Sequence, residues 1–277
     1  MKMNSSKRIV PPRVLLEKTQ QLLSEMLKDK KVSIENIEKY YKVESKLRLA
    51  DKRCKVSLND VFARMIGSQQ NRSMMPNVIK YWDYQNTLFD KVLKHHDPQE
   101  VLDTYNSAED LYHAILNEWP KDAKPLDKEM KGLWAQWCKA VLSAAKFIVQ
   151  FKDIEALREA FGALYNNTWA RAALPALLAM EVQGLQFTLA CDFLKECGYD
   201  YPKPDVHLTD VFREVCDVED SFAVYRKIIE YAAELNMTAY KLDKMIWLVC
   251  SGNFYLDKQK CPDKKEKLLK ALREYRQ

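Results

Sequence analysis

The sequence predicts an all-α protein, and two observations support this class. The chain of 277 residues contains only six glycines, and it has no Asn-Gly or Asp-Gly pair of the kind that closes a tight β-hairpin. Strong helix formers dominate, and apolar residues recur every three or four positions instead of alternating with polar ones. We therefore expect helices that pack their apolar faces together.

The N-terminal part of the chain is expected to be a helical extension over residues 1–50. Residues 1–12 are basic but lack the apolar stretch of a secretory signal, and we expect them to be unstructured. Apolar spacing predicts an amphipathic helix over 13–28 and a more charged one over 33–49. The sequence does not reveal what this extension does.

Helix-start signals organise the rest of the chain. The clearest are the polar cap at Ser57–Asp60, the Asp97-Pro98 pair and a capping box at Ser107–Asp110. In the long helix at 133–151, Trp134 and Trp137 are expected to be core residues rather than a platform for stacking bases. The expected helices cover 61–70, 78–89, two segments within 97–119, 133–151, 153–161, a segment starting near 172, 185–196, 208–215, 221–235, 238–249 and 263–277.

Composition limits the possible functions only weakly. The formal net charge of +5 permits nucleic-acid binding, although many proteins with this charge bind none. Seven scattered cysteines without a CxxC pair predict reduced thiols, no iron–sulfur cluster, no metal and no cofactor. No apolar run is long enough for a membrane span, so we expect no membrane partner and a cytoplasmic location, at the nucleoid if the source is bacterial.

The stretch from Ala179 to Phe212 is the most informative part of the sequence. A helix is followed by a tight turn at residues 182–184, a second helix and a Pro-rich loop that carries Asp205 and His207. Pro202 and Pro204 stiffen the approach to Asp205. Taken alone, a carboxylate at such a junction is either a helix cap or a catalytic group.

Several segments in order resemble the helix-hairpin-helix superfamily of DNA glycosylases. MIGSQQNRS at 65–73 is similar to that superfamily's ILSQQTS-like segment, and EVQGLQFTLACDFL at 181–194 is similar to its LPGVGxKTA hairpin. PKPDVHLTDVF at 202–212 resembles the PVDTHV-like segment with the catalytic aspartate, and LDKMIW resembles VDxALW in the last core helix. The resemblance runs from about residue 57 to 249, and it implies two helical subdomains that flank a DNA-binding cleft.

The resemblance implies a role for each matched residue. Asp205 would stabilise the positive charge that develops on the sugar, and His207 would contact a phosphate or shape the loop. A base that leaves the duplex must be replaced, and Gln70 would fill the gap with Gln69 and Asn71 as neighbours.

The hairpin resembles the DNA-binding element of the superfamily but departs from its pattern. Gly184 would let the backbone approach a phosphate. Val182 stands where the motif has its first glycine, and Gln186 stands in the register of the Schiff-base lysine of bifunctional members. An amide forms no imine, so the enzyme is expected to be monofunctional.

Two residues of the LDKMIW segment are candidates for the base pocket. Asp243 would accept hydrogen bonds from a base edge, or else it is a surface acid paired with Lys244 or Lys241. Trp247 would stack on an extruded base, or else it packs in the core.

The expected function is excision of a damaged or modified base from double-stranded DNA in base excision repair, by a monomer. Which base is removed stays open. A glycosylase-like DNA-binding protein without chemistry and an unrelated helical scaffold are the alternatives. Within a glycosylase-like domain at 51–277, residues 71–190 would form a helical barrel. Residues 51–70 plus 191–277 would form the second subdomain, onto which the N-terminal segment closes.

Overall fold

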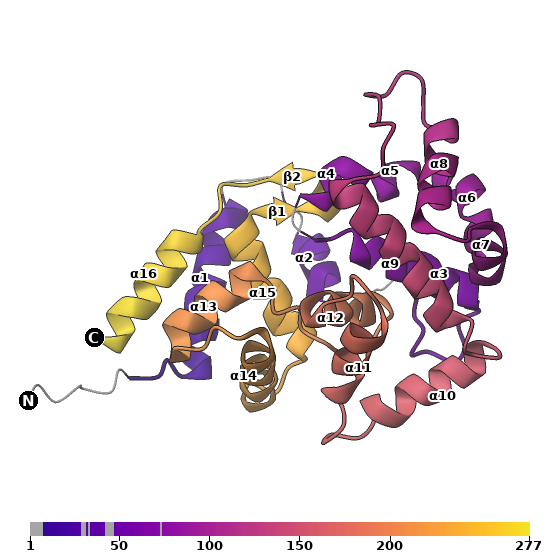
Figure 1. Cartoon of the computed structure of the whole chain (residues 1–277). Coiled ribbons are helices and arrows are strands. Elements are labelled where there is room, and N and C mark those ends of the chain that lie inside the picture. Colours follow the sequence, from indigo (N-terminus) through magenta and orange to yellow (C-terminus); the bar gives the residue numbers. More distant parts are fainter. Residues whose placement is uncertain (1–7, 29–31, 33, 42–46, 73) are drawn as a thin grey trace, which may run out of the picture. The chain divides into compact units, whose positions relative to one another are not determined.

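The computed structural model describes residues 8–28, 32, 34–41, 47–72 and 74–277 (Figure 1). α-Helices dominate these residues, which confirms the expected all-α class. The described strands form one small antiparallel pair, β1 (Asn253–Phe254) and β2 (Gln259–Lys260). Within the described residues, no helix is both long and apolar enough to cross a membrane.

The chain folds as two compact units. One combines Met1–Glu44 with Asp200–Gln277, and the other is Ser45–Tyr199. These bounds differ from the expected ones, which grouped residues 51–70 and 191–199 with the C-terminal helices. Both segments lie in the second unit because the helix at Leu58–Gln69 packs on the helices at Gly132–Ile148 and Phe187–Glu196. The expected DNA-binding cleft stays a prediction.

The first unit is built around α15 (Ala239–Ser251). Five other described α-helices of this unit, α1, α2, α13, α14 and α16, pack against it, and Figure 1 shows α1, α13 and α15 side by side. They bury a continuous apolar core between both ends of the chain. These elements are α1 (Pro12–Lys28), α2 (Ile34–Tyr41), α13 (Val206–Cys216), α14 (Ser221–Glu234), η2 (Tyr255–Asp257) and α16 (Lys265–Arg276).

The N-terminal segment departs from the sequence prediction. Val10 is fully buried and its N–H donates to the Val215 carbonyl at 3.0 Å, so the expectation of an unstructured segment is wrong for residues 8–12. The part of that prediction at residues 1–7 lies outside the described residues. α2 ends at Tyr41, and the chain over residues 47–50 is not helical, so the second helix is shorter than expected. Residues 33 and 42–46 of that prediction lie outside the described residues.

The second unit is built around α9 (Gly132–Ile148). α3, α4, α7 and α8 pack against it, and Trp137 is fully buried in the core, as predicted. Ser107 forms the predicted capping box with Asp110, and the predicted polar cap at Ser57 is also a capping box, with Asp60. The remaining elements are α3 (Leu58–Gln69), α4 (Met75–Ile79), α5 (Tyr81–Tyr84), α6 (Leu88–Val92), η1 (Lys94–His96), α7 (Pro98–Thr104), α8 (Ala108–Glu118), α10 (Ile154–Tyr165), α11 (Ala173–Glu181) and α12 (Phe187–Glu196).

The predicted helix at 78–89 is wrong. The segment forms parts of three short helices, α4, α5 and α6, and Lys80 adopts a left-handed backbone with φ of 55°. The break turns Tyr81 into the core, where it is fully buried, and the Tyr81 N–H donates to the Gln70 side chain. Burial of this aromatic ring therefore overrides local helix propensity.

Candidate functional site

Helices α11 and α12 form a helical hairpin in the second unit, as the sequence predicts. They pack on each other and are joined by residues 182–186. Gly184 has φ of 88°, a left-handed conformation that favours glycine. A Cβ atom at Gly184 would lie 2.8 Å from the Cβ of Ala140, which is too close for any other residue without a shift. The turn thus presses its backbone against α9.

The Gln69 side chain links the hairpin turn to α9 by hydrogen bonds. Its side chain is buried, and Nε2 donates to the carbonyls of Ala140 at 3.1 Å and Gln183 at 3.0 Å. The N–H of the same residue, Gln183, donates to Ser143 Oγ at 2.9 Å. These bonds fix the turn to α9. The Gln69 amide faces the interior, and its place beside a residue that fills a gap in DNA stays a prediction.

Gln70 is also buried, with an exposed fraction of 1%. Its Oε1 accepts the N–H of Tyr81 at 2.9 Å, which satisfies a backbone donor at the start of α5. Gln70 therefore does not project toward solvent in this structure. Its role as the residue that fills the gap left by a displaced base stays a prediction.

The two residues that follow Gln70, Asn71 and Arg72, are exposed. Asn71 Nδ2 donates to Asp192 Oδ2 at 2.9 Å, and Asp192 is buried beside Lys195. Arg72, which sequence reasoning did not single out, is exposed and donates to Gln136 Oε1 at 2.8 Å. Its signal in the sequence was a guanidinium directly after the amide cluster, the type of side chain that contacts phosphate.

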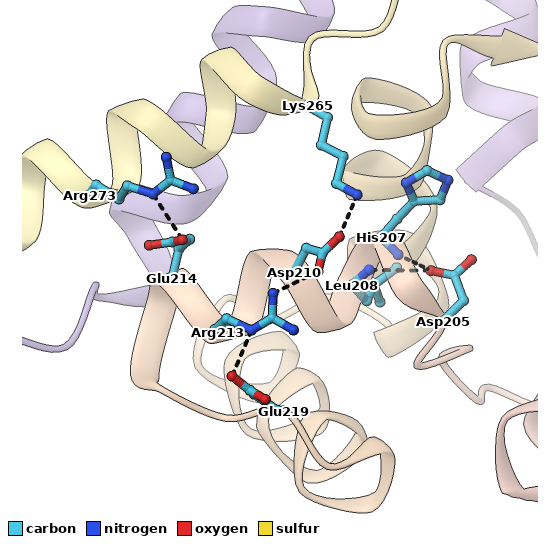
Figure 2. A network of polar contacts seen from close by, with 9 residues as sticks. All are labelled: Asp205, His207, Leu208, Asp210, Arg213, Glu214, Glu219, Lys265 and Arg273. Atoms are coloured by element: carbon cyan, nitrogen blue, oxygen red, sulfur yellow. Dashed lines mark hydrogen bonds and ion pairs between the residues drawn. The ribbon is translucent and has the colours of Figure 1, made fainter.

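Asp205 is the N-cap of α13 in the first unit. Its Oδ1 accepts the N–H groups of His207 at 2.9 Å and Leu208 at 3.3 Å (Figure 2). Its Oδ2 makes no hydrogen bond within the part of the chain that the structure describes, and the side chain is partly exposed. Oδ1 therefore caps the helix, which is one of the two roles that the sequence allowed. The lone pairs of Oδ2 are not used by a hydrogen bond within the described residues.

The loop that presents Asp205 is fastened to α15 at two points. The Asp200 carboxylate accepts the Tyr240 N–H at 2.8 Å, and Asp243 Oδ2 accepts the Lys203 N–H at 2.8 Å. The Lys203 carbonyl in turn accepts the Asp205 N–H at 2.7 Å. Asp243 has an exposed fraction of 2%, so the alternative of a surface acid is wrong. In the structure Asp243 positions the loop, and its contact with a base edge stays a prediction.

Charged and titratable groups surround this part of α13 (Figure 2). Burial would raise the pKa of Asp210, but hydrogen bonding and charge from Lys265, helped by Arg213, lower it. Burial raises the pKa of the Cys250 thiol to about 12, which Lys265 opposes and Asp205 reinforces. Cys250 is therefore a protonated core residue and no nucleophile.

His207 is partly buried, and its Nδ1 has no hydrogen-bond partner within the described residues. The ring extends from the first turn of α13, whereas the backbone N–H of the same residue is held by Asp205 (Figure 2). An unsatisfied buried ring nitrogen costs free energy unless a ligand or water supplies a partner. The predicted phosphate contact of His207 stays a prediction.

Trp247 lies on α15 and is partly buried against the core of its unit. Its ring centroid is 6.2 Å from that of Tyr255, and Lys244 Nζ lies 4.7 Å from the Trp247 centroid. Cation–π attraction holds the buried lysine in this position. Core packing thus occupies part of the ring, and stacking on an extruded base stays a prediction.

The predicted site residues fall into two groups. Asp205, His207, Asp243 and Trp247 belong to the first unit, and Gln69, Gln70, Asn71, Gly184 and Gln186 belong to the second. Gln186 is exposed and is the N-cap of α12 without a capping bond from its side chain. No group of three or more His, Cys, Asp or Glu side chains suited to a metal occurs among the described residues.

No protein-family model matches the chain, and neither the curated proteins nor the solved structures contain one that is significantly similar to it.

Proposed function

We propose that the chain is a monofunctional DNA glycosylase that flips a damaged or modified base out of duplex DNA and hydrolyses its N-glycosidic bond. The observation that carries this proposal is the Asp205 carboxylate. Two backbone N–H groups hold one of its oxygens, and the other makes no hydrogen bond within the described part of the chain. A carboxylate fixed in this way suits stabilisation of a cationic sugar.

The proposed reaction needs few protein groups. The bond between the base nitrogen and C1′ breaks, water adds its hydroxyl to C1′, and a proton ends on the departing base. Asp205 would stabilise the positive charge at C1′ and orient the attacking water. Since Asp205 is held by its own helix and its loop is tied to α15, its position requires no metal or cofactor ligand.

The hairpin supports the DNA-binding part of the proposal. Gly184 brings the backbone of the turn close to α9, and the bonds of Gln69 and Ser143 keep the turn rigid. A rigid turn before a helix N-terminus is suited to a phosphate. For Gln70 to fill a gap in the duplex, it must first release the Tyr81 N–H, whereas Asn71 and Arg72 are already exposed.

The test is base release by the Asp205→Asn variant. Duplexes that each carry one defined lesion are incubated with the protein and assayed for alkali-labile sites. Asparagine caps helices as well as aspartate does, so the variant should stay folded and bind DNA while base release falls at least 100-fold. Asp220→Asn is the matched control, because Asp220 caps α14 with the same two-bond geometry.

The second candidate is a DNA-binding protein without chemistry. The similarity between the capping geometry of Asp205 and that of Asp220 favours it, because a helix cap alone explains the Asp205 contacts. Duplex binding without release of any base from the panel would support this candidate. Equal release by the wild type and Asp205→Asn would show that another group performs the chemistry. Negligible affinity for a duplex with an abasic-site analogue would instead favour a helical scaffold for protein partners.

A further inference from the structure

A polar groove lies in the second unit beside the hairpin turn. It has a volume of about 370 Å³ and is bounded by α9, by the start of α8 and by Gln183 of the turn. The residues that give it its chemistry are Lys139, Ser143 and Lys146 on α9, Asn106 and Ser107 before α8, and Gln183. None of these residues takes part in the proposed chemistry at Asp205.

The spacing on α9 places its three polar residues on one helix face. Lys139, Ser143 and Lys146 follow one another at intervals of four and three residues, which is one side of an α-helix. Both lysines are exposed, and neither forms an ion pair within the described part of the chain. Glu109 is the acidic residue of the groove, so two lysines and one glutamate line it. The groove therefore favours an anion.

The hairpin turn makes the wall of this groove rigid. The Gln183 N–H donates to Ser143 Oγ at 2.9 Å, and the Gln183 carbonyl accepts from the buried Gln69 at 3.0 Å. The same turn is pressed against Ala140 at Gly184. Because Gln183 of the turn lines the same groove as Lys139 and Lys146, a DNA backbone bound at the turn would have both lysines beside it. Preorganised groups of this kind lose little entropy on binding.

The separation of the lysines fits a polymer better than a single small anion. Seven residues of α-helix advance by about 10 Å. Each strand of duplex DNA carries one phosphate per roughly 3.4 Å of helix axis, so about three phosphates lie along that length. Two lysines at this separation reach different phosphates of one strand.

We infer that this groove binds the phosphodiester backbone of duplex DNA, with Lys139 and Lys146 contacting separate phosphates next to the one at the hairpin. The inference rests on the proposed function, because it extends the DNA contact of the same hairpin. It adds a second binding surface along α9.

The test measures duplex affinity as a function of salt for full-length Lys139→Gln/Lys146→Gln. The slope of log affinity against log salt should become shallower by about one to two, and affinity at low salt should fall on the order of 10-fold. Lys121→Gln/Lys128→Gln is the matched control. It removes the same charge from exposed lysines in the loop between α8 and α9 that do not border the groove, so its slope should equal that of the wild type.

The outcomes distinguish failure of the groove inference from failure of the proposed function. A wild-type slope in the groove variant, with DNA binding intact, overturns the groove while leaving the proposed function in place. Equal losses in both double variants show a general charge effect and also overturn it. If the wild type has no salt-dependent duplex affinity, the proposed function fails as well. Selective loss of inorganic tripolyphosphate binding without loss of duplex binding would assign the groove to a free phosphorylated ligand and overturn the inference.

Discussion

Three consecutive residues, Lys94, His95 and His96, adopt a left-handed backbone with φ between 53° and 57°. This conformation costs roughly 1–2 kcal/mol for each residue with a side chain. The turn buries His96, whose ring meets Tyr81 edge-on at a centroid distance of 6.0 Å. His96 Nε2 is buried without a hydrogen-bond partner within the described residues. Packing against Tyr81 helps to offset the strain, and burial favours the neutral imidazole over the charged one.

The stability of the protein is therefore expected to fall in mild acid. Burial lowers the pKa of His96, the carboxylates of Asp90 and Asp60 oppose this, and His95 reinforces it. The unfolded chain takes up this proton near pH 6.5, whereas the folded chain does so only at lower pH. The contribution of neutral His96 to the free energy of unfolding is thus fully present above about pH 6.5. It is lost as the pH falls below that value.

Urea unfolding at pH 7.5 and 5.5 checks this prediction. The His96→Gln variant should show a smaller loss of unfolding free energy between the two pH values than the wild type does. Exposed His113→Gln is the control and should behave like the wild type. An unchanged pH dependence in His96→Gln would show that other groups cause the loss.

At the scale of elements, the α11–α12 hairpin combines a rigid turn with an amide at the start of its second helix. Gln186 is exposed at the N-cap of α12, at the position where a bifunctional enzyme of the proposed kind would carry its Schiff-base lysine. Lys195, on the same helix, is buried and lies 3.4 Å from Asp192. A buried lysine that is held in an ion pair is a poor nucleophile.

Borohydride treatment of the protein with lesion-containing duplex is therefore expected to trap no covalent adduct. A lyase needs an unprotonated amine that attacks C1′ of the sugar, and the hairpin register offers an amide in its place. Denaturing electrophoresis of labelled DNA measures the adduct. Gln186→Asn, which also lacks an amine, should give the same blank result. A strong adduct with the wild type would contradict the monofunctional proposal and direct attention to another lysine.

At the scale of the whole molecule, the first unit is assembled from both ends of the chain. Arg276 Nε donates to the Arg8 carbonyl at 2.9 Å, and the Tyr231 hydroxyl donates to the Val10 carbonyl at 2.7 Å. α1 packs on α15 and α16. The N-terminal helices are therefore part of the core of the first unit. The second unit is the continuous segment of the sequence between the two parts of the first.

A cavity in α1 should weaken the first unit selectively. Leu15 is fully buried in the core of that unit, and Leu15→Ala should cost about 2–5 kcal/mol. Hydrogen exchange should show lost protection in α13 and α15, while α3 and α9 in the other unit keep theirs. Gln20→Ala, an exposed position on α1, should leave both unchanged. Equal loss of protection in all four helices would show that the chain unfolds as one cooperative unit.

The sequence by itself determined the helical class, the capped helix starts at Ser57 and Ser107 and the hairpin with its turn at Gly184. These features follow from apolar spacing, side-chain caps and backbone freedom, which act between residues close in the chain. Asp205 as a helix cap belongs to the same group, since its bonds reach only two and three residues ahead.

Only the tertiary structure determined that the side chains of Gln69, Gln70 and Asp243 are buried. Each is polar, and the sequence placed them toward DNA or solvent. In the fold each is buried because distant backbone groups need partners. Gln69 bonds to residues 71 and 114 positions away, and Asp243 to one 40 positions away. The break of the expected helix at 78–89 has the same origin, since burial of Tyr81 outweighs local propensity. Such contacts depend on how helices pack, which no local pattern encodes.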